Sequence, residues 1–168
     1  MANSTTFRSL KNTSLIIILI MSVFTSCTKE SLEEGVNLTT ADAHNMVAIE
    51  QELLVLINEH RDALGHNALA FNEVAYAYAN DHTNYMMAEG TLSHDNYNTR
   101  ATKMANEVGA NHVGENVAKN YNSAEEALEK WLESSNHKKT IEGDFSFTGI
   151  SVKEDDNGNI YYTQIFYQ

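Results

Sequence analysis

Two strand-like runs at the end of the chain restrict its fold more than any other feature. The segments FTGISVKE (147–154) and NIYYTQIFY (159–167) are rich in β-branched and aromatic residues. The turn between them contains Asn157 and Gly158, a pair typical of a tight hairpin. Helical patterns precede this hairpin, without a regular alternation of strands and helices. The order favours an α+β layered fold over a doubly wound parallel sheet.

Four helices are predicted upstream of the hairpin, over residues 46–64, 73–89, 99–108 and 124–134. Gly65 ends the first. Asn72 is the expected N-cap of the second, with Phe71 and Tyr76 as a hydrophobic staple and Gly90 just past its end. Ser123 and Glu126 form a capping box for the fourth. The segment HVGENVAKN (112–120) is predicted to be a short strand or loop.

An export signal is predicted at the start of the chain. Residues 1–26 contain no acidic residue, two basic residues and the apolar run LIIILIM. That run is shorter than the roughly 20 apolar residues of a membrane-spanning helix. The sequence VFTSC resembles the lipobox of bacterial lipoproteins, whose cysteine is acylated, and attached acyl chains anchor a protein without a spanning helix. We therefore predict a signal peptide over 1–26, lipidation at Cys27, and a polar tether over 27–43.

The remaining residues, 44–168, are expected to form one domain, since a chain of 168 residues with 42% hydrophobic content suits a single core. Cys27 is the only cysteine, so no internal disulfide can form. The formal net charge is −12, and removal of residues 1–26 takes two positive charges away to leave −14. Such an acidic surface repels phosphate backbones, so we expect no nucleic-acid partner.

Three residues are the main candidates for chemistry. His94 and His137 lie in polar, loop-like segments, where a scaffold can present a side chain to a cleft. Glu115 could ligate a metal ion directly, or it could fix the ring of one of these histidines by accepting a hydrogen bond from its N–H. Two histidines and a carboxylate occur together in catalytic zinc sites. These histidines are 43 positions apart, so the spacing leaves both a metal site and a polar loop network open.

The other candidates are weaker. His82 lies on the apolar stripe of the second helix and is interpreted first as a hydrogen-bonded core residue and second as a site residue. His44, His60 and His66 are expected to be solvated. Ser93 is only a sequence neighbour of His94, and no GxSxG motif or phosphate-binding loop occurs. The sequence therefore gives little support to nucleophilic catalysis.

Several motifs in order resemble those of the CAP superfamily, the group of cysteine-rich secretory protein, antigen 5 and pathogenesis-related 1, also called SCP-like. They are LLVLINEHRDALGHNAL, AYANDHTNYMMAEGTLSHDN, VGENVA, KWLESSNH and TGISV with IYYTQIF, and they span about residues 50–168. The disulfide-free bacterial branch is the most similar. The resemblance implies a three-layer α/β/α sandwich with a central antiparallel sheet and an open cleft lined by histidines and acids.

The resemblance also assigns individual residues. His94 and His137 match the two cleft histidines, and Glu115 matches the acid of the GEN motif, in which Asn116 is expected to hold the loop. A second acid common in the family, three residues after the tryptophan, is replaced here by Ser134. The matching Asn58, Arg61 and Trp131 are expected to be structural.

The leading functional hypothesis is an exported, lipid-anchored CAP-domain protein of the cell envelope. Its cleft would bind a divalent cation such as zinc through His94 and His137, with Glu115 orienting an imidazole or approaching the metal, and would hold a small or lipid-like ligand. One alternative is a metal-dependent hydrolase or peptidase with Glu115 as general base. The other is a surface module that binds a protein partner.

Overall fold

The computed structural model describes residues 45–168. The elements run in the order α1 (Val47–Ala63), β1 (Ala70–Phe71), α2 (Glu73–Glu89), α3 (Tyr97–Val108), β2 (Val113–Lys119), α4 (Ala124–Glu133), α5 (Ser135–Ile141), β3 (Phe147–Glu154) and β4 (Ile160–Tyr167). Residues 45–168 lie within one compact unit. The predicted signal peptide, Cys27, the tether and His44 lie outside the described residues.

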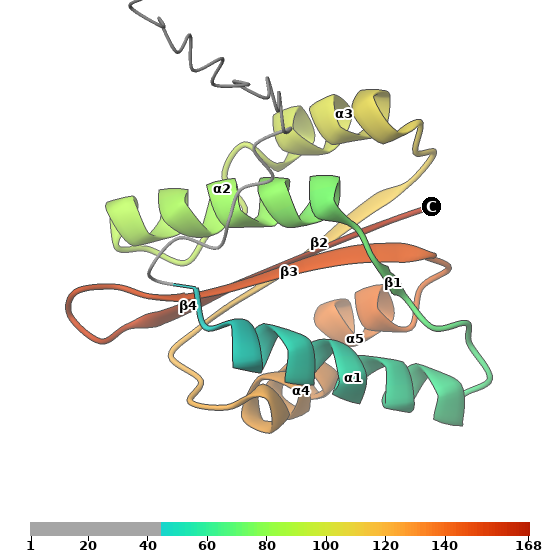
Figure 1. The fold of residues 1–168 in the computed structure, drawn as a ribbon, viewed down its shortest axis with the longest axis horizontal. Coiled ribbons are helices and arrows are strands. Elements are labelled where there is room, and N and C mark those ends of the chain that lie inside the picture. The colour runs from blue at the N-terminus through green and yellow to red at the C-terminus, as the bar shows by residue number, and fades with distance from the viewer. Residues whose placement is uncertain (1–44) are drawn as a thin grey trace, which may run out of the picture. The chain divides into compact units, whose positions relative to one another are not determined.

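The four strands form one sheet in the order β1-β3-β4-β2. β4 pairs antiparallel with β3 on one side and with β2 on the other, and β1 adds a two-residue parallel pairing beside Phe147 and Thr148. Helices α2 and α3 cover one face of the sheet, and α1, α4 and α5 cover the other (Figure 1). The expected three-layer α/β/α sandwich with a largely antiparallel sheet is confirmed.

Alternation along the strands divides the core between the two helical layers, because successive strand side chains point to opposite faces. On β4, Tyr162 and Phe166 join the larger cluster beneath the sheet, which contains Trp131 of α4. Tyr161 and Ile165 lie in the clusters formed with α2 and α3. The sheet is therefore buried on both faces.

Local signals placed the starts of α2 and α4 correctly, whereas α3 begins at Tyr97, two residues before its predicted start. The Asn72 side chain accepts a hydrogen bond from the Ala75 N–H at 3.0 Å, and the rings of Phe71 and Tyr76 lie 5.5 Å apart. The Ser123 hydroxyl accepts from the Glu126 N–H at 3.2 Å. The Glu126 carboxylate accepts from the N–H of Asn122, whereas in a capping box it would accept from the N–H of the N-cap residue itself. The bonds from the Ala75 and Glu126 N–H groups satisfy donors that a helix start leaves unpaired.

One segment differs from the sequence-based prediction, and the structure decides an alternative that the sequence left open. The helix predicted for 124–134 ends at Glu133, but the polar SSNHKK segment that follows was wrongly interpreted as a loop, because it forms the helix α5. Seven residues are too few to show helical periodicity. HVGENVAKN contains the edge strand β2, which resolves the strand-or-loop alternative.

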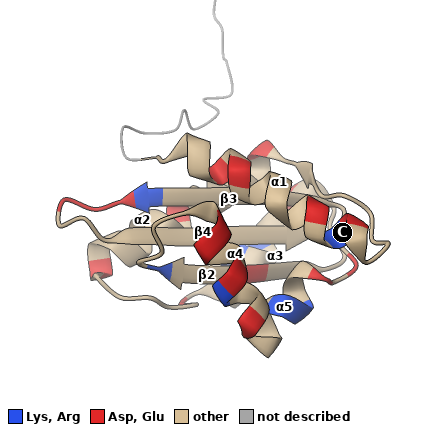
Figure 2. Cartoon of the chain, turned by 90° about the horizontal axis from the view of Figure 1, so that it is seen from below, with Lys and Arg blue, Asp and Glu red and all other residues tan. Residues whose placement is uncertain are grey.

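Charged side chains are unevenly spread over the described residues. Acidic positions occur along α1 and α4, whereas α5 presents basic positions (Figure 2), which are Lys138 and Lys139. Over residues 45–168, none of the helices is both long and apolar enough to cross a lipid bilayer.

Candidate functional site

A cleft of about 650 Å³ opens along the free edge of β2. Because β2 is an edge strand, side chains from the helical layers on both faces of the sheet can meet around it. The cleft is lined by His94, Tyr97, His112, Val113, Gly114, Glu115, Asn136, Lys139, Thr140, Gly143, Asp144, Phe145 and Gln168. The site therefore combines the loop before α3, strand β2, helix α5 and the segment that follows α5.

Glu115 is held by an arginine that the sequence analysis did not identify. Arg100 of α3 donates from Nε to Glu115 Oε2 at 2.8 Å and from Nη2 to Oε1 at 2.9 Å. The side chains are nearly buried, with exposed fractions of 2% for Glu115 and 10% for Arg100. This fork-like pairing fixes the plane of the carboxylate as well as its charge.

The fixed carboxylate in turn orients His94. The Nδ1 atom of His94 lies 2.9 Å from Glu115 Oε1, and an ionised carboxylate can only accept, so Nδ1 carries the proton. In the neutral ring, Nε2 then holds the free lone pair. The His94 side chain is 52% exposed and lines the cleft. This arrangement presents a lone-pair nitrogen beside a water-accessible cavity.

His137 is positioned by the next residue of the same motif. Asn116 points to the opposite face of β2 and donates from Nδ2 to the backbone oxygen of His137 at 3.1 Å. The imidazole packs near the Trp131 ring, with centroids 6.4 Å apart. Burial lowers the pKa of His137, and the nearby His94 lowers it further. His137 is not among the residues that line the cleft, although its helix neighbours Asn136 and Thr140 are.

His82 is a core histidine of α2 that lies next to Glu115. Its Nε2 donates to the Ser93 carbonyl at 2.8 Å and lies 3.8 Å from Glu115 Oε1. Its Nδ1 is buried without a hydrogen-bond partner among the described residues. Protonation would place an unpaired N–H there, and burial lowers the pKa of His82. The first interpretation, a hydrogen-bonded core residue, fits this geometry.

We predict that the domain loses stability as the pH falls below about 6.5, the ordinary histidine pKa. The unfolded chain takes up a proton at His82 in that range, whereas burial keeps the folded ring neutral, so acid favours the unfolded state. His82→Gln should flatten this part of the profile, and the exposed His66→Gln should leave it unchanged. Urea unfolding between pH 5 and 8 would measure both. Parallel profiles for wild type and His82→Gln would contradict the prediction.

Arg61 does not line the cleft but holds the backbone of residues that do. This fully buried side chain at the end of α1 donates to the backbone oxygens of Asn67, Ile141, Gly143 and Phe145. Gly143 and Phe145 line the cleft, and the Phe145 ring stacks on His112 at 5.1 Å. The structural role expected for Arg61 agrees with these contacts, and the same role for Asn58 agrees with its bonds to the backbone of Leu69.

The geometry supports the orienting role of Glu115 more than a ligand role. Both of its oxygens already accept from Arg100, and Oε1 also accepts from His94. Within residues 45–168, no group of three or more His, Cys, Asp and Glu side chains is arranged to hold a metal ion.

Solved structures of bacterial proteins share this fold. An outer surface protein from Borrelia burgdorferi aligns with a TM-score of 0.67 at 18% identity, over 74% of this chain and 97% of its own. An extracellular protein containing an SCP domain from Bacillus anthracis gives 0.62 at 26% identity, over 73% and 41%. A cysteine-rich secretory protein from Staphylococcus aureus gives 0.61 at 17%, over 76% and 40%. The chain thus spans about two fifths of the last two proteins.

A search of curated proteins found no match. The family model described as CAP, cysteine-rich secretory protein family, matches residues 54–166, which include the whole of the Arg100, Glu115 and His94 arrangement. The sequence motifs, the sandwich fold and this match agree. The chain belongs to the cysteine-rich secretory protein, or CAP, family.

Proposed function

We propose that this chain is an exported, lipid-anchored binding protein whose cleft holds a divalent cation, zinc in the first place, through His94 and His137. The observation that carries the proposal is the 2.9 Å contact between His94 Nδ1 and Glu115, within the arginine clamp. Metal-ligating histidines commonly donate their second ring N–H to a carboxylate, which fixes the tautomer and raises the basicity of the ligand nitrogen. When bound, the cation would offer open coordination positions to a ligand.

The cleft lining combines charged side chains, which can fix the polar groups of a small ligand, with apolar ones such as Val113 and Phe145. His112 and Lys139 line the cleft together with the two acids Glu115 and Asp144. The edge of β2 adds backbone groups. Carbonyls of Val113 and Val117 point outward, where they accept from Tyr97 and Trp131. By strand alternation the Glu115 N–H and C=O point the same way, toward the cleft.

The arrangement favours binding over hydrolysis. A general base must have an oxygen free to take a proton from water. The Glu115 oxygens are both engaged by Arg100, and the side chain is 2% exposed. We therefore place the hydrolase or peptidase alternative second. A protein partner for the cleft is the third alternative, which the loss of both histidines would leave unaffected.

Export is supported by two of the similar structures, which are an outer surface protein and an extracellular protein. Anchoring rests on the lipobox-like sequence before Cys27. Labelling of cells with radioactive palmitate should mark the wild-type protein and not Cys27→Ser. Equal labelling of both would remove the anchor from the proposal.

Zinc titration by calorimetry on residues 34–168 tests the cation site. Wild type should bind one ion, and His94→Ala or His137→Ala should abolish the heat. Glu115→Gln should weaken binding by about 10- to 100-fold without abolishing it, as expected for a group that orients a ligand. His66→Ala, a change at an exposed histidine, is the matched control. Unchanged binding in His94→Ala would contradict the site, and an equal loss in the His66 variant would indicate non-specific binding.

A further inference from the structure

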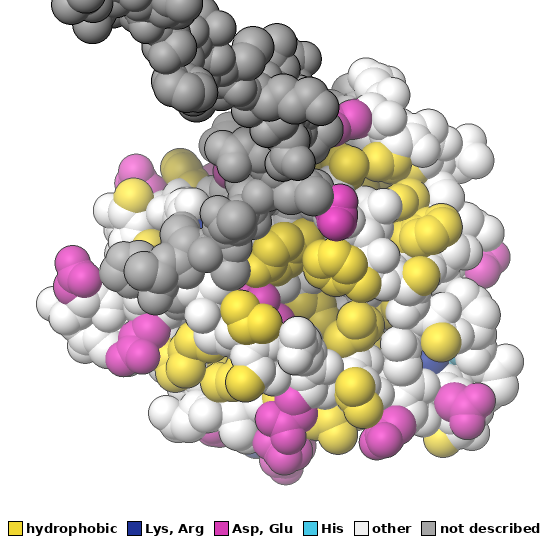
Figure 3. Space-filling view, in the orientation of Figure 1, with side chains coloured by type: hydrophobic (Ala, Val, Ile, Leu, Met, Phe, Trp, Pro, Cys, Tyr) yellow, Lys and Arg dark blue, Asp and Glu magenta, His cyan; other side chains and the backbone are white. Residues whose placement is uncertain are grey.

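The edge of the sheet opposite to β2 carries a second cavity, of about 400 Å³, which we call the edge groove. It lies beside β3, the strand farthest from β2 apart from the two residues of β1. Hydrophobic side chains gather between α1 and α2 on this face (Figure 3). The groove is lined by Val47, Glu50, Gln51 and Leu54 of α1, Phe71 of β1, Tyr76 of α2, and Thr148 and Ile150 of β3.

Every second residue of β3 directs its backbone N–H and C=O groups away from β4, toward this groove. The Thr148 carbonyl accepts from the Asn72 N–H at 2.8 Å. Two positions beyond Ile150, the Val152 carbonyl accepts from the Met46 N–H at 2.8 Å, and the Val152 N–H donates to Glu50 Oε1 at 2.9 Å. Both residues thus point away from β4 and are covered by neighbouring segments.

Ile150 lies between them and points the same way, because backbone groups alternate along an antiparallel ladder. Among the described residues, no hydrogen bond pairs its N–H or C=O at this edge. The residue is only 3% exposed. A buried, unpaired backbone donor and acceptor carry a free-energy cost that a bound partner can relieve. The edge groove therefore contains an unfilled position of a β-ladder.

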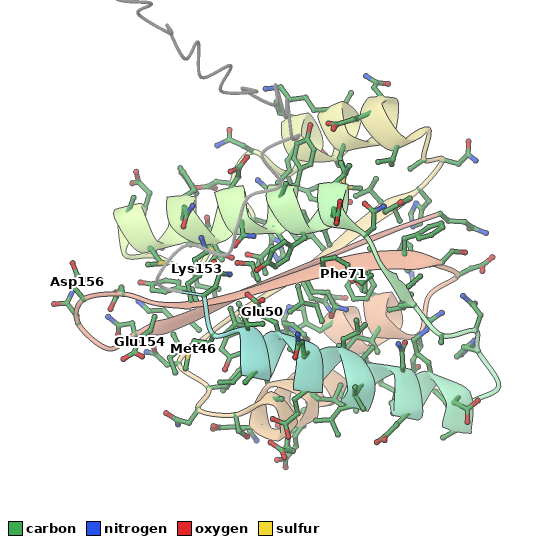
Figure 4. All side chains as sticks on the ribbon, in the orientation of Figure 1. Met46, Glu50, Phe71, Lys153, Glu154 and Asp156 are labelled. Atoms are coloured by element: carbon green, nitrogen blue, oxygen red, sulfur yellow. The ribbon has the colours of Figure 1, made fainter. Side chains whose placement is uncertain are left out.

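The walls of the groove indicate what else a partner presents. Val47 and Phe71 are 39% and 53% exposed, so the groove offers apolar surface to a large side chain. Glu50 lies on the α1 side and Phe71 at β1 (Figure 4). The Glu50 carboxylate accepts from the Tyr76 hydroxyl, the Asn45 amide and the Val152 N–H. Burial raises the pKa of this carboxyl group, and the charge of the nearby Lys153 opposes that rise. The attraction for a basic residue therefore comes from the chain as a whole, whose formal net charge is −12.

We propose that the edge groove binds an extended peptide segment of a partner protein, carrying one large apolar side chain next to a basic residue, through backbone hydrogen bonds to Ile150. Strand addition of this kind takes its affinity from the main chain and its specificity from side-chain pockets. Thr148 and Val152 are about 13 Å apart at the rise of a strand. Both are already covered, so the paired region is limited to about one residue of the partner.

Nuclear magnetic resonance on ¹⁵N-labelled residues 34–168 tests this proposal with the peptide acetyl-Lys-Phe-Lys-amide. The largest chemical-shift changes should occur at the Ile150 amide and around Phe71. The same peptide with an N-methylated phenylalanine lacks the N–H that would donate to Ile150. Its dissociation constant should be higher by at least about tenfold. Equal binding of the two peptides, or shifts centred on the β2 cleft, would overturn the proposal.

Matched variants separate the groove from other surfaces. Phe71→Ser should weaken binding of the unmodified peptide by at least about tenfold, whereas Val55→Ser, a change at an equally exposed apolar residue of α1, should not. His94→Ala should bind the peptide normally, which distinguishes this proposal from the cation site. Sedimentation that shows dimers at the same concentrations, dissociated by Phe71→Ser and not by peptide, would assign the groove to a second copy of the chain and overturn the proposal.

Discussion

Arg100→Met should destabilise the domain by about 3 to 5 kcal/mol, the usual effect of removing one partner from a buried ion pair. The variant would leave the Glu115 carboxylate, which is 2% exposed, without its only arginine contact among the described residues. Urea unfolding can be followed through Trp131, the single tryptophan, which is 1% exposed. A loss below about 1 kcal/mol would show that the pair lies in a more solvated environment than the structure indicates.

Two further variants separate charge from packing. Lys103→Met changes an exposed residue of the same helix and should have little effect. Adding Glu115→Gln to Arg100→Met should recover much of the stability, because the buried side chain is then uncharged. If the double variant were as unstable as the single one, packing of the arginine stem rather than an unpaired charge would account for the loss.

Gly149→Ala should cost about 3 kcal/mol or more, at or above the upper end of the range for overpacked cores. A Cβ at this position on β3 would overlap the backbone of α2 at Ala75 and Tyr76. Backbone atoms cannot rotate away, so α2 would have to move off the sheet. The expected result is a large drop in thermal and urea midpoints, together with loss of the edge groove, which Tyr76 lines.

The same substitution on β2, at the other edge of the sheet, gives a control. At Gly114, a Cβ would meet the end of the Phe145 ring at 2.8 Å and the Thr140 methyl at 3.0 Å, which are side-chain atoms that can move. Gly114→Ala should therefore destabilise the domain less than Gly149→Ala. The reverse order would contradict the view that α2 rests directly on the sheet at Gly149.

Features fixed by neighbouring residues were predictable from the sequence. The caps at Asn72 and Ser123, the terminal hairpin and the layered fold class all depend on short-range patterns or on their order. Residue type and polar context singled out His94, His137 and Glu115, and the family motif added Asn116. The structure brings His94 into contact with Glu115 and Asn116 into contact with the His137 backbone.

Contacts between distant segments were not predictable in the same way. Arg100 is a basic residue within a polar helix, and no local pattern reveals that its partner is a carboxylate 15 positions later. His112 lines the cleft because the segment after α5 brings Phe145 against it. β1 consists of two residues, too few for any strand signal. The cation, the ligand and lipidation stay predictions.

The opposite orientations of Glu115 and Asn116 determine how β2 aligns with the rest of the sheet. Each residue is tied to a different helical layer, Glu115 to Arg100 above the sheet and Asn116 to α5 below it. A shift of β2 by one residue would exchange their directions, placing a charge against α5 and an amide against the arginine. Only one alignment of β2 forms both contacts, so a chain with β2 shifted by one residue would lose the contact of Glu115 with Arg100 and that of Asn116 with α5.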